Sequence, residues 1–355
     1  MQGNKLYADY LLNEINNVKA PVSLMEVCGT HTMAIAKSGL RSLIPPNIKL
    51  LSGPGCPVCV TAQGDIDAVI ELVKQPGVIL TTFGDMMRVP GTESSLQEER
   101  GMGADVRVVY SPLDALSIAR LNPDKEVVFL GIGFETTAPT VAVCLEQAAE
   151  EKLRNFSVWS LHKIVPPAIE AIFIDPEIQV DGLICPGHVS AVIGLEPYEK
   201  LVGRYFKPCV ITGFETLDII EGIWMLVRQV VHGPSEAAIQ YKRVVRPQGN
   251  IAAREAIERV FKPVNARWRG LGEIPGSGLE PQVQFERFNA KKKFDIPEFE
   301  DKPIKGCGCG DVLKGKMAPP ECSLFGKGCT PLKPIGPCMV SHEGACAAYY
   351  RFAKA

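Results

Sequence analysis

The sequence predicts an α/β fold with two similar parallel-sheet domains, followed by a smaller C-terminal domain. Three observations predict it. Short apolar, β-branched runs recur through the first two thirds of the 355 residues, and each ends in a turn marked by glycine or proline. Helical patterns separate most of these runs. Six of the 12 cysteines then lie in the last 55 residues, where apolar periodicity is weak.

The apolar runs form two sets of four. Continuous apolar runs that alternate with helices are typical of parallel strands buried on both faces. We therefore predict one α/β domain over residues 1–122 and a second over residues 123–233. The predicted strands span residues 22–27, 48–53, 77–82 and 106–110, and then 126–131, 156–161, 182–185 and 209–213. The helical patterns include residues 65–74, 112–120 and 137–152.

A short motif occurs twice in the second predicted domain. It reads GFETT at residues 133–137 and GFET at residues 213–216, each time after or at the end of a predicted strand. This repeated motif is consistent with an internal duplication of the sequence. Because both copies lie in one predicted domain, they do not establish a two-domain repeat.

The pattern changes from residue 234. Helical stretches are predicted at 235–245 and 250–261, and a segment rich in proline and glycine follows from 263 to 303. The cysteine-rich tail has too little apolar periodicity to fold on its own core, so we predict a third domain over residues 234–355 that a metal centre helps to hold together. The N-terminal helix is a candidate to pack on this domain.

Composition excludes several classes of function. The net charge is −2 and no dense basic surface is encoded, so neither a nucleic-acid backbone nor an anionic membrane is an expected partner. The N-terminus is not a secretory signal, and no uncharged apolar stretch reaches about 18 residues. We expect a cytoplasmic protein, in which cysteines are metal ligands or redox thiols. The sequence has no phosphate-binding G-x-x-x-x-G-K-[ST] motif, which argues against nucleotide hydrolysis.

Polar and thiol side chains gather in the turns that follow the predicted strands. In open parallel sheets, ligands bind outside the carboxyl ends of the strands. The turns of the first set carry Cys28, His31, Cys56, Cys59, Asp85 and Arg88, and those of the second set carry Glu135, His162, Lys163, Cys185, His188 and Glu215.

The C-x-x-C motif formed by Cys56 and Cys59 falls at the predicted start of a helix, where thiol pKa values are lowered. If the first two strands are neighbours, Cys28 can join this pair as a three-thiol cluster with His31 nearby. Thiolates and imidazole suit iron, zinc or copper(I). Two inert buried cysteines are the alternative. For His31, a ligand or proton-transfer role and a capping or packing role both stay open.

The remaining turn residues have two interpretations each. Glu135 and Glu215 either contact a ligand or the facing domain, or belong to helix N-termini where a threonine caps and an acid favours the first turn. Asp85 and Arg88 either bind an anion or a partner, or form a surface ion pair. For His188 we favour a functional role.

The tail cysteines indicate an iron–sulfur cluster. Structural zinc sites usually contain closely paired cysteines, whereas four well-separated thiolates suit a cubane cluster. Taking Cys307, Cys322, Cys329 and Cys346 as the four gives the spacing C-x14-C-x6-C-x16-C. Cys309 and Cys338 would then be left as a thiol pair that can exchange electrons with the cluster. Spacing alone does not decide which four are ligands, and a zinc site or a disulfide-linked tail remains an alternative.

Taken together, the motifs resemble one family, HypD, the [NiFe]-hydrogenase maturation factors. The resemblance runs from about residue 20 to residue 350. It rests on MEVCGTHT (25–32), SGPGCPVCVT (52–61), TFGDMMRVPG (82–91), GFETTAPT (133–140), CPGHVSAVIG (185–194), TGFE (212–215) and the tail cysteines.

The resemblance implies a fold and a role. It implies two Rossmann-like domains of four strands each that face a cleft, and a C-terminal domain with a [4Fe-4S] cluster. It implies a cytoplasmic complex with the chaperone HypC, in which an iron ion receives two cyanides and one carbon monoxide. HypE would deliver the cyanide after HypF supplies its carbamoyl precursor. The finished Fe(CN)2CO unit would pass to the hydrogenase large subunit.

The resemblance also implies roles for individual cysteines. Cys28 matches an iron ligand shared with HypC, and Cys56 and Cys59 match a redox-active pair near that iron. The implied cluster ligands are Cys307, Cys322, Cys329 and Cys346, and the implied second thiol pair is Cys309 and Cys338. An assembly scaffold with redox activity is favoured over a turnover enzyme. An iron–sulfur thiol–disulfide oxidoreductase and a passive metal-storage protein are the alternatives.

Overall fold

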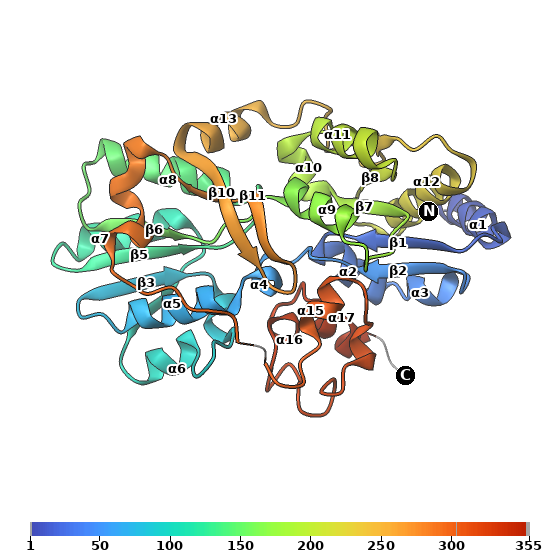
Figure 1. The fold of residues 1–355 in the computed structure, drawn as a ribbon. Helices are drawn as coiled ribbons and strands as arrows, with labels where there is room; N and C mark the ends of the chain where they lie inside the picture. The colour runs from blue at the N-terminus through green and yellow to red at the C-terminus, as the bar shows by residue number, and fades with distance from the viewer. Residues whose placement is uncertain (1, 303, 353–355) are drawn as a thin grey trace.

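The computed structural model describes residues 2–302 and 304–352. Two bodies, each with its own parallel sheet, lie side by side (Figure 1). An antiparallel hairpin lies between them, and the C-terminal segment lies below the hairpin in this view. The prediction of an α/β protein with two parallel sheets is therefore confirmed.

The larger sheet has five parallel strands in the order β2-β1-β7-β8-β9. These are β1 (Val22–Glu26), β2 (Ile48–Ser52), β7 (Gly182–Pro186), β8 (Cys209–Thr212) and β9 (Ala237–Ile239). The helices of this body are α1 (Gln2–Asn17), α2 (Gly29–Lys37), α3 (Leu40–Leu43), α9 (Val165–Ile174), α10 (Gly187–Ile193), α11 (Glu196–Tyr205) and α12 (Thr216–His232). The long helix α12 packs on β7 and β8, because its apolar face is buried there.

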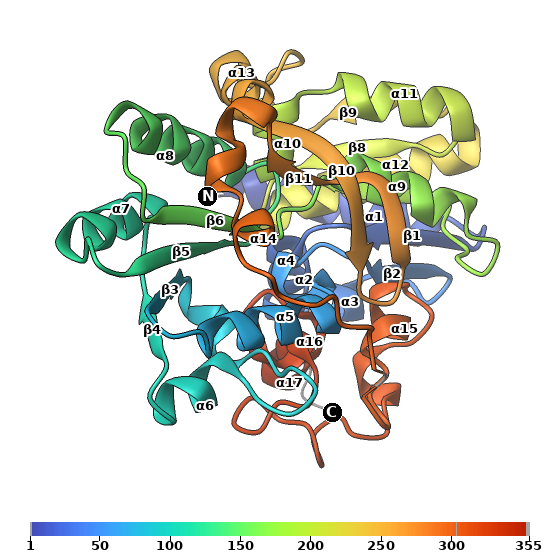
Figure 2. The same ribbon diagram turned by 60° about the vertical axis from the view of Figure 1, so that its left-hand side comes forward.

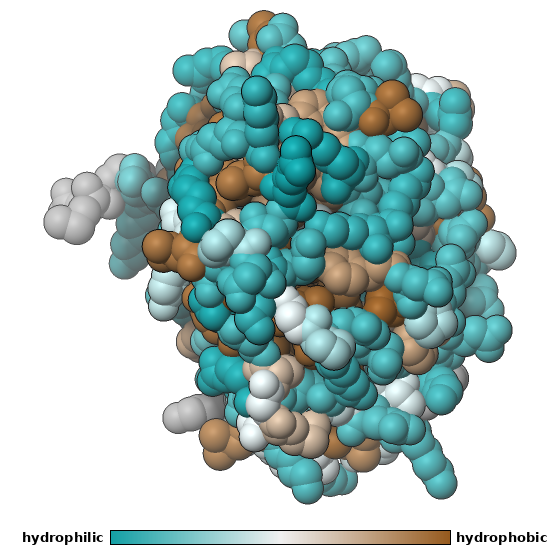
Figure 3. All heavy atoms as spheres, turned by 90° about the vertical axis from the view of Figure 1, so that its left-hand side faces the viewer, coloured by the Kyte–Doolittle hydropathy of each residue, from teal (hydrophilic) through white to brown (hydrophobic). Residues whose placement is uncertain are grey.

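The smaller sheet has four parallel strands in the order β4-β3-β5-β6. These are β3 (Val78–Thr82), β4 (Asp105–Val108), β5 (Glu126–Gly131) and β6 (Phe156–Ser160). Its helices are α4 (Pro57–Val60), α5 (Gln63–Val73), the 3-10 helix η1 (Gly84–Arg88), α6 (Leu96–Gly101), α7 (Pro112–Leu121) and α8 (Ala138–Glu150). The outer face of this body is mainly hydrophilic (Figure 3), so the apolar sides of these helices turn inward.

The predicted division of the strands into two consecutive sets of four is wrong. The chain leaves the larger sheet after β2, builds the whole smaller sheet, and returns when β7 pairs with β1. Position 122 falls between β4 and β5, which flank β3 in one sheet. Strands buried on both faces look alike in sequence, so their pattern predicts burial and does not identify the neighbouring strand.

Two further differences concern residues 235–281. The stretch 235–245, predicted to be helical, contains the edge strand β9, which pairs with β8 from Cys209↔Ala237 to Ile211↔Ile239. The helix predicted next is present as α13 (Ile251–Val260). The segment rich in proline and glycine then forms the antiparallel hairpin of β10 (Phe261–Trp268) and β11 (Gly272–Pro281). Buried Trp268 anchors this hairpin by stacking on Phe134, with ring centroids 6.1 Å apart.

The C-terminal segment wraps against both bodies. After the hairpin, η2 (Val283–Phe288) and α14 (Ala290–Lys293) lie along β6, in front of the smaller sheet in Figure 2. The short elements α15 (Cys309–Leu313), η3 (Pro319–Glu321), α16 (Pro337–Val340) and α17 (Ala345–Phe352) follow. Helix α16 packs on α4 and α17 packs on α2, so the tail meets the turns after β2 and β1.

The N-terminal helix α1 does not pack as predicted. It runs along α12, buries Leu11 and Ile15 in the core of the larger body, and donates a hydrogen bond from Tyr7 to Glu221 (2.9 Å). Its apolar face therefore belongs to the larger sheet and not to the C-terminal segment. Within the described residues, no helix is long and apolar enough to cross a membrane.

Candidate functional site

Cys28 lies at the carboxyl end of β1, at the N-cap of α2, and its side chain is buried. Strands β1 and β2 are parallel neighbours, as the sequence argument required, so their two turns meet. The amide of Gly29 donates to the carbonyl of Gly55 (2.9 Å). A Cβ at Gly55 would lie 2.1 Å from the backbone nitrogen of Cys28, so only glycine permits this approach.

A cavity of about 400 Å³ opens beside Cys28. It is lined from both bodies, because the turns after β1, β2 and β7 face the turns after β3 and β5. Its polar or ionisable lining side chains are Cys28, Thr30, Asp85, Thr136, Thr137, His188, Ser341 and Glu343. We call this space the cleft cavity.

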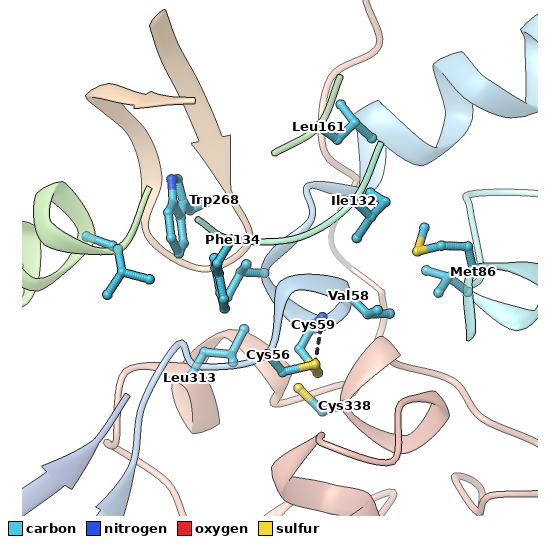
Figure 4. Packing of buried hydrophobic residues seen from close by; sticks show 14 of the residues in the cluster. Cys56, Val58, Cys59, Met86, Ile132, Phe134, Leu161, Trp268, Leu313 and Cys338 are labelled. Carbon is cyan, nitrogen blue, oxygen red and sulfur yellow. Dashed lines mark hydrogen bonds between the residues drawn. A yellow bond between two sulfur atoms is a disulfide. The ribbon is translucent and has the colours of Figure 1, made fainter. Parts of the chain in front are cut away.

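Cys56 and Cys59 are joined by a disulfide across the single turn of α4. Cys56 occupies the N-cap of this helix, and its sulfur accepts a hydrogen bond from the amide of Cys59 (3.2 Å; Figure 4). Both residues are buried. The i, i+3 spacing and Pro57 at the first helical position bring the two Cα atoms to 5.2 Å, within the range that a disulfide needs.

A second sulfur pair lies next to the first. The sulfurs of Cys309 and Cys338 are 2.7 Å apart, and Cys338 sits beside the Cys56–Cys59 pair (Figure 4). The sulfur of Cys59 is 3.9 Å from the carbonyl oxygen of Pro337, the residue before Cys338. Helix α16 on α4 thus brings together two cysteine pairs that are about 280 residues apart in the chain.

Six cysteines surround one small apolar cavity in the tail, which we call the six-cysteine cavity. They are Cys307, Cys309, Cys322, Cys329, Cys338 and Cys346. Leu324, Phe325 and Met339 complete its wall. In the described ranges, no group of three or more histidine, cysteine or acidic side chains stands as a ready metal site, in the tail or around Cys28. The donor set and its apolar enclosure nevertheless have the chemistry that a thiolate-bound iron–sulfur cluster requires.

Burial controls the charge state of the groups near β1. It raises the pKa of the Cys28 thiol to about 12, so this thiol is protonated at neutral pH. Burial also raises the pKa of Glu26 to about 7. One Glu26 oxygen accepts from the hydroxyl of Thr32 (2.7 Å), and the other has no hydrogen-bond partner among the described residues.

The two predicted histidines have different environments. His31 is fully buried, does not line the cleft cavity, and donates from Nε2 to the carbonyl of Gly213 (2.9 Å). Burial lowers its pKa to about 4. His188 lines the cleft cavity and stacks on Phe214 with centroids 3.9 Å apart, while His31 stacks on the same ring at 4.7 Å. His31 has the contacts of a packing residue, and His188 faces the cavity.

The other predicted turn residues divide in the same way. Asp85 lines the cleft cavity and accepts from Ser341 (3.1 Å), and Arg88 donates to the carbonyl of Pro331 (3.2 Å), so both contact the C-terminal segment. Buried Glu135 accepts from the amide of Val165 (3.0 Å).

Glu215, in contrast, is exposed at the N-cap of α12 and forms a capping box with Asp218. Of the acids in the two GFET copies, neither lines the cleft cavity.

Sequence reasoning missed Glu343. It enters the cleft cavity from the tail and accepts from the hydroxyl of Thr30 (2.8 Å), two residues after Cys28. A Cβ at Gly29 would lie 2.5 Å from the Glu343 side chain, so the tail is seated closely on the turn after β1. Thr30 belongs to the CGTHT motif. Glu343 is over 300 residues away in the chain, and no local sequence pattern indicates that it contacts Thr30.

The fold and site define a class of protein. Two parallel-sheet bodies hold a buried thiol in a cleft cavity, the Cys56–Cys59 pair lies in the neighbouring turn after β2, and Cys338 beside that pair belongs to the six-cysteine cavity. Such a gathering of thiols has the chemistry to bind metal ions or to exchange electrons.

Comparison with known proteins then identifies the family. The family described as "HypD: Hydrogenase formation hypA family" matches residues 6–353. Hydrogenase maturation factor HypD of Rhodobacter capsulatus is 47% identical over 94% of this chain and 90% of its own, and that of Escherichia coli is 45% identical over 94% and 89%. A putative hydrogenase expression/formation protein of Methanocaldococcus jannaschii is 41% identical over 97% and 95%. The chain belongs to the HypD family of hydrogenase maturation factors.

Proposed function

We propose that this hydrogenase maturation factor is the scaffold on which, together with HypC, the Fe(CN)2CO unit is assembled. The observation that carries the proposal is that buried Cys28 lies in the turn next to the Cys56–Cys59 turn, and that Cys338 of the six-cysteine cavity lies beside the Cys56–Cys59 pair. Iron is the cargo in this reaction. HypE as cyanide donor, HypF upstream of it, and the hydrogenase large subunit as acceptor are the further partners that the family resemblance suggests.

Cys28 is the proposed iron ligand from this chain, with a HypC cysteine as the second. Its thiol lines a cavity of about 400 Å³, which is large enough for a metal ion with small ligands. The raised pKa means that iron must displace a proton, and burial then keeps the resulting thiolate away from water. His188 and Glu343 are the side chains placed to exchange protons or hydrogen bonds at this cavity.

Electrons would reach this cavity through the cysteine pairs. Reduction of the Cys56–Cys59 disulfide takes two electrons and two protons and yields two thiols. A reduced Cys309–Cys338 pair supplies these electrons and protons if its thiols attack the Cys56–Cys59 disulfide and form a Cys309–Cys338 disulfide in turn. The contact of α16 with α4 supports this exchange, because it brings Cys338 beside Cys56 and Cys59.

The proposed cluster ligands are Cys307, Cys322, Cys329 and Cys346. All four line the six-cysteine cavity, and Leu324 and Phe325 keep it apolar. A bound [4Fe-4S] cluster would supply electrons one at a time. Metal binding by these cysteines would also stabilise the tail, which has few regular elements of its own.

The test is an infrared spectrum of the chain co-purified with HypC, without oxygen, from a host with the complete maturation machinery. Cyanide and carbonyl stretches fall where protein does not absorb, and two cyanides with one carbonyl predict three bands. Cys28→Ala should abolish them. The matched control is Cys144→Ala, which removes a buried thiol of α8 outside the site and should keep all three bands. Normal bands in the Cys28 variant would refute the ligand assignment.

The second candidate is a thiol–disulfide oxidoreductase, and the adjacency of the two cysteine pairs is the observation that favours it. Such an enzyme would reduce a partner disulfide repeatedly and would not need Cys28. If the chain reduced a protein disulfide catalytically at equal rates with and without Cys28, and the infrared bands were absent, the oxidoreductase function would replace the scaffold function as our proposal.

A further inference from the structure

A second cavity of about 310 Å³ lies at the carboxyl end of β6, beneath the β10–β11 hairpin. It shares no lining residue with the cleft cavity. Helix α5, the hairpin and residues 291–298 form its walls. This position, outside the end of a parallel strand and covered by another segment, is typical of small-molecule sites in α/β proteins, and the volume is at the small end of their range.

Lys163 is the residue at this cavity that the proposed function does not use. Its side chain is only 2% exposed, a degree of burial that is rare for a lysine. The nearest carboxylate oxygen, of Asp65, is 3.9 Å from the ammonium nitrogen, which is beyond hydrogen-bond range. Across the described residues, the Lys163 ammonium makes no hydrogen bond to protein. A buried ammonium group needs an acceptor, because burial without one is costly.

The other cations at this cavity are already engaged. Arg267 donates to Asp65 (2.8 Å) and to the carbonyl of Phe299 (2.5 Å), and Lys291 pairs with Glu280 (3.4 Å). Of these three cations, only Lys163 has no hydrogen-bonded carboxylate among the described residues, while the lining as a whole carries four carboxylates, those of Asp65, Glu273, Glu280 and Glu298. A ligand placed against the Lys163 ammonium therefore needs a negatively charged group of its own.

The acids around the cavity restrict the charge of that group. Asp65 is close to Lys163, and Glu273 and Glu298 are exposed at the mouth. A doubly charged phosphate or sulfate would be repelled by these carboxylates, whereas a singly charged group can pair with Lys163 alone. A carboxylate meets this condition and accepts the strong, charge-assisted hydrogen bonds that an ammonium donates.

We propose that this cavity is a binding site for a small monocarboxylate, held by the ammonium group of Lys163. The site is independent of the iron and of the cysteines. A backbone hydrogen bond connects the walls of the two cavities. The amide of Lys163 donates to the carbonyl of Gly133 (2.9 Å), and Gly133 lines the cleft cavity. The ligand would therefore stabilise the turn that forms one wall of the iron site.

The test is calorimetric titration of the chain with acetate and pyruvate, with acetamide and sulfate as uncharged and doubly charged probes. Either carboxylate should bind, and acetamide and sulfate should bind at least tenfold more weakly. Lys163→Met should weaken carboxylate binding by about 10- to 100-fold, the value of a charged hydrogen bond. The matched control, Lys200→Met, changes a lysine of α11 that pairs with Glu196 outside this cavity and should stay within about threefold of the wild type.

A pH series gives a second readout that a merely structural lysine would not produce. Burial lowers the pKa of Lys163 to about 8, with Asp65 and Asp301 opposing the shift and Lys291 and Arg267 adding to it. Carboxylate affinity should consequently fall as pH rises above about 8. Equal binding by the wild type and Lys163→Met, affinity that does not change up to pH 10, or no binding by either carboxylate would overturn the proposal. None of these outcomes bears on the infrared test of the scaffold.

Discussion

The two GFET copies have the same residues, but their side chains lie in different environments. In the first copy, Phe134 stacks on Trp268 of the hairpin and Glu135 is buried. In the second, Phe214 lies between His31 and His188. The acid of that copy, Glu215, is exposed at the start of α12. The first copy lies under the hairpin, and the second lies at the start of α12, where its glutamate faces solvent. A local motif thus predicts a turn, and the segment packed over that turn decides what its side chains do.

The strongest way to test this comparison is to remove each glutamate in turn. Glu135→Ala leaves the buried amide of Val165 without its acceptor and opens a small void, so unfolding should become easier by about 2–4 kcal/mol. Glu215→Ala removes a helix cap and an exposed ion pair with Arg243 (3.5 Å), and should cost about 1 kcal/mol. Denaturant unfolding of the two variants measures both values. Equal losses would mean that the copies are equivalent after all.

The pH dependence of stability sharpens the same contrast. Burial raises the pKa of Glu135 to about 7, above the value near 4.5 of an exposed glutamate. The folded chain therefore binds more protons than the unfolded chain between these values. The contribution of Glu135 is complete below pH 4.5 and is lost as pH rises through about 7, by up to about 3 kcal/mol. Glu135→Gln should remove this part of the slope.

Unfolding followed from pH 5 to pH 8 tests that prediction. Glu26, whose pKa burial also raises to about 7, is unchanged in the variant, so part of the slope should remain. A slope that does not respond to Glu135→Gln would mean that Glu135 is ionised in the folded chain.

The smallest expected effect concerns the aromatic rings. Burial lowers the pKa of His188, and Phe214 covers one face of its ring. Phe214→Ala should admit water and raise the His188 pKa toward its ordinary value of 6.5, as measured by NMR titration. Phe134→Leu, in the other copy, should leave the His188 titration unchanged because that ring stacks on Trp268. Equal shifts in both variants would indicate a general loosening of the cleft.

Several features of this protein follow from local sequence alone. Continuous apolar runs specified parallel strands, because side chains buried on both faces must be apolar. Glycine- and proline-marked turns placed Cys28, Cys56 and Cys59 at the carboxyl ends of β1 and β2, and the pairing of those strands brought the turns together. The short motifs around Cys28 and Cys56 and in the second body, with the tail cysteines, also predicted the HypD family, to which the chain belongs.

Only the tertiary structure decided which strands share a sheet, and what covers each turn. The return of the chain from β6 to β7 depends on the fit of whole faces, which no short run encodes. Glu343 beside Thr30, Cys338 beside the Cys56–Cys59 pair, and the hairpin over Lys163 are all contacts between distant segments. The burial of a side chain, its pKa and its access to solvent depend on such contacts. They are set by residues that are close in space and not by the residues that come next in the chain.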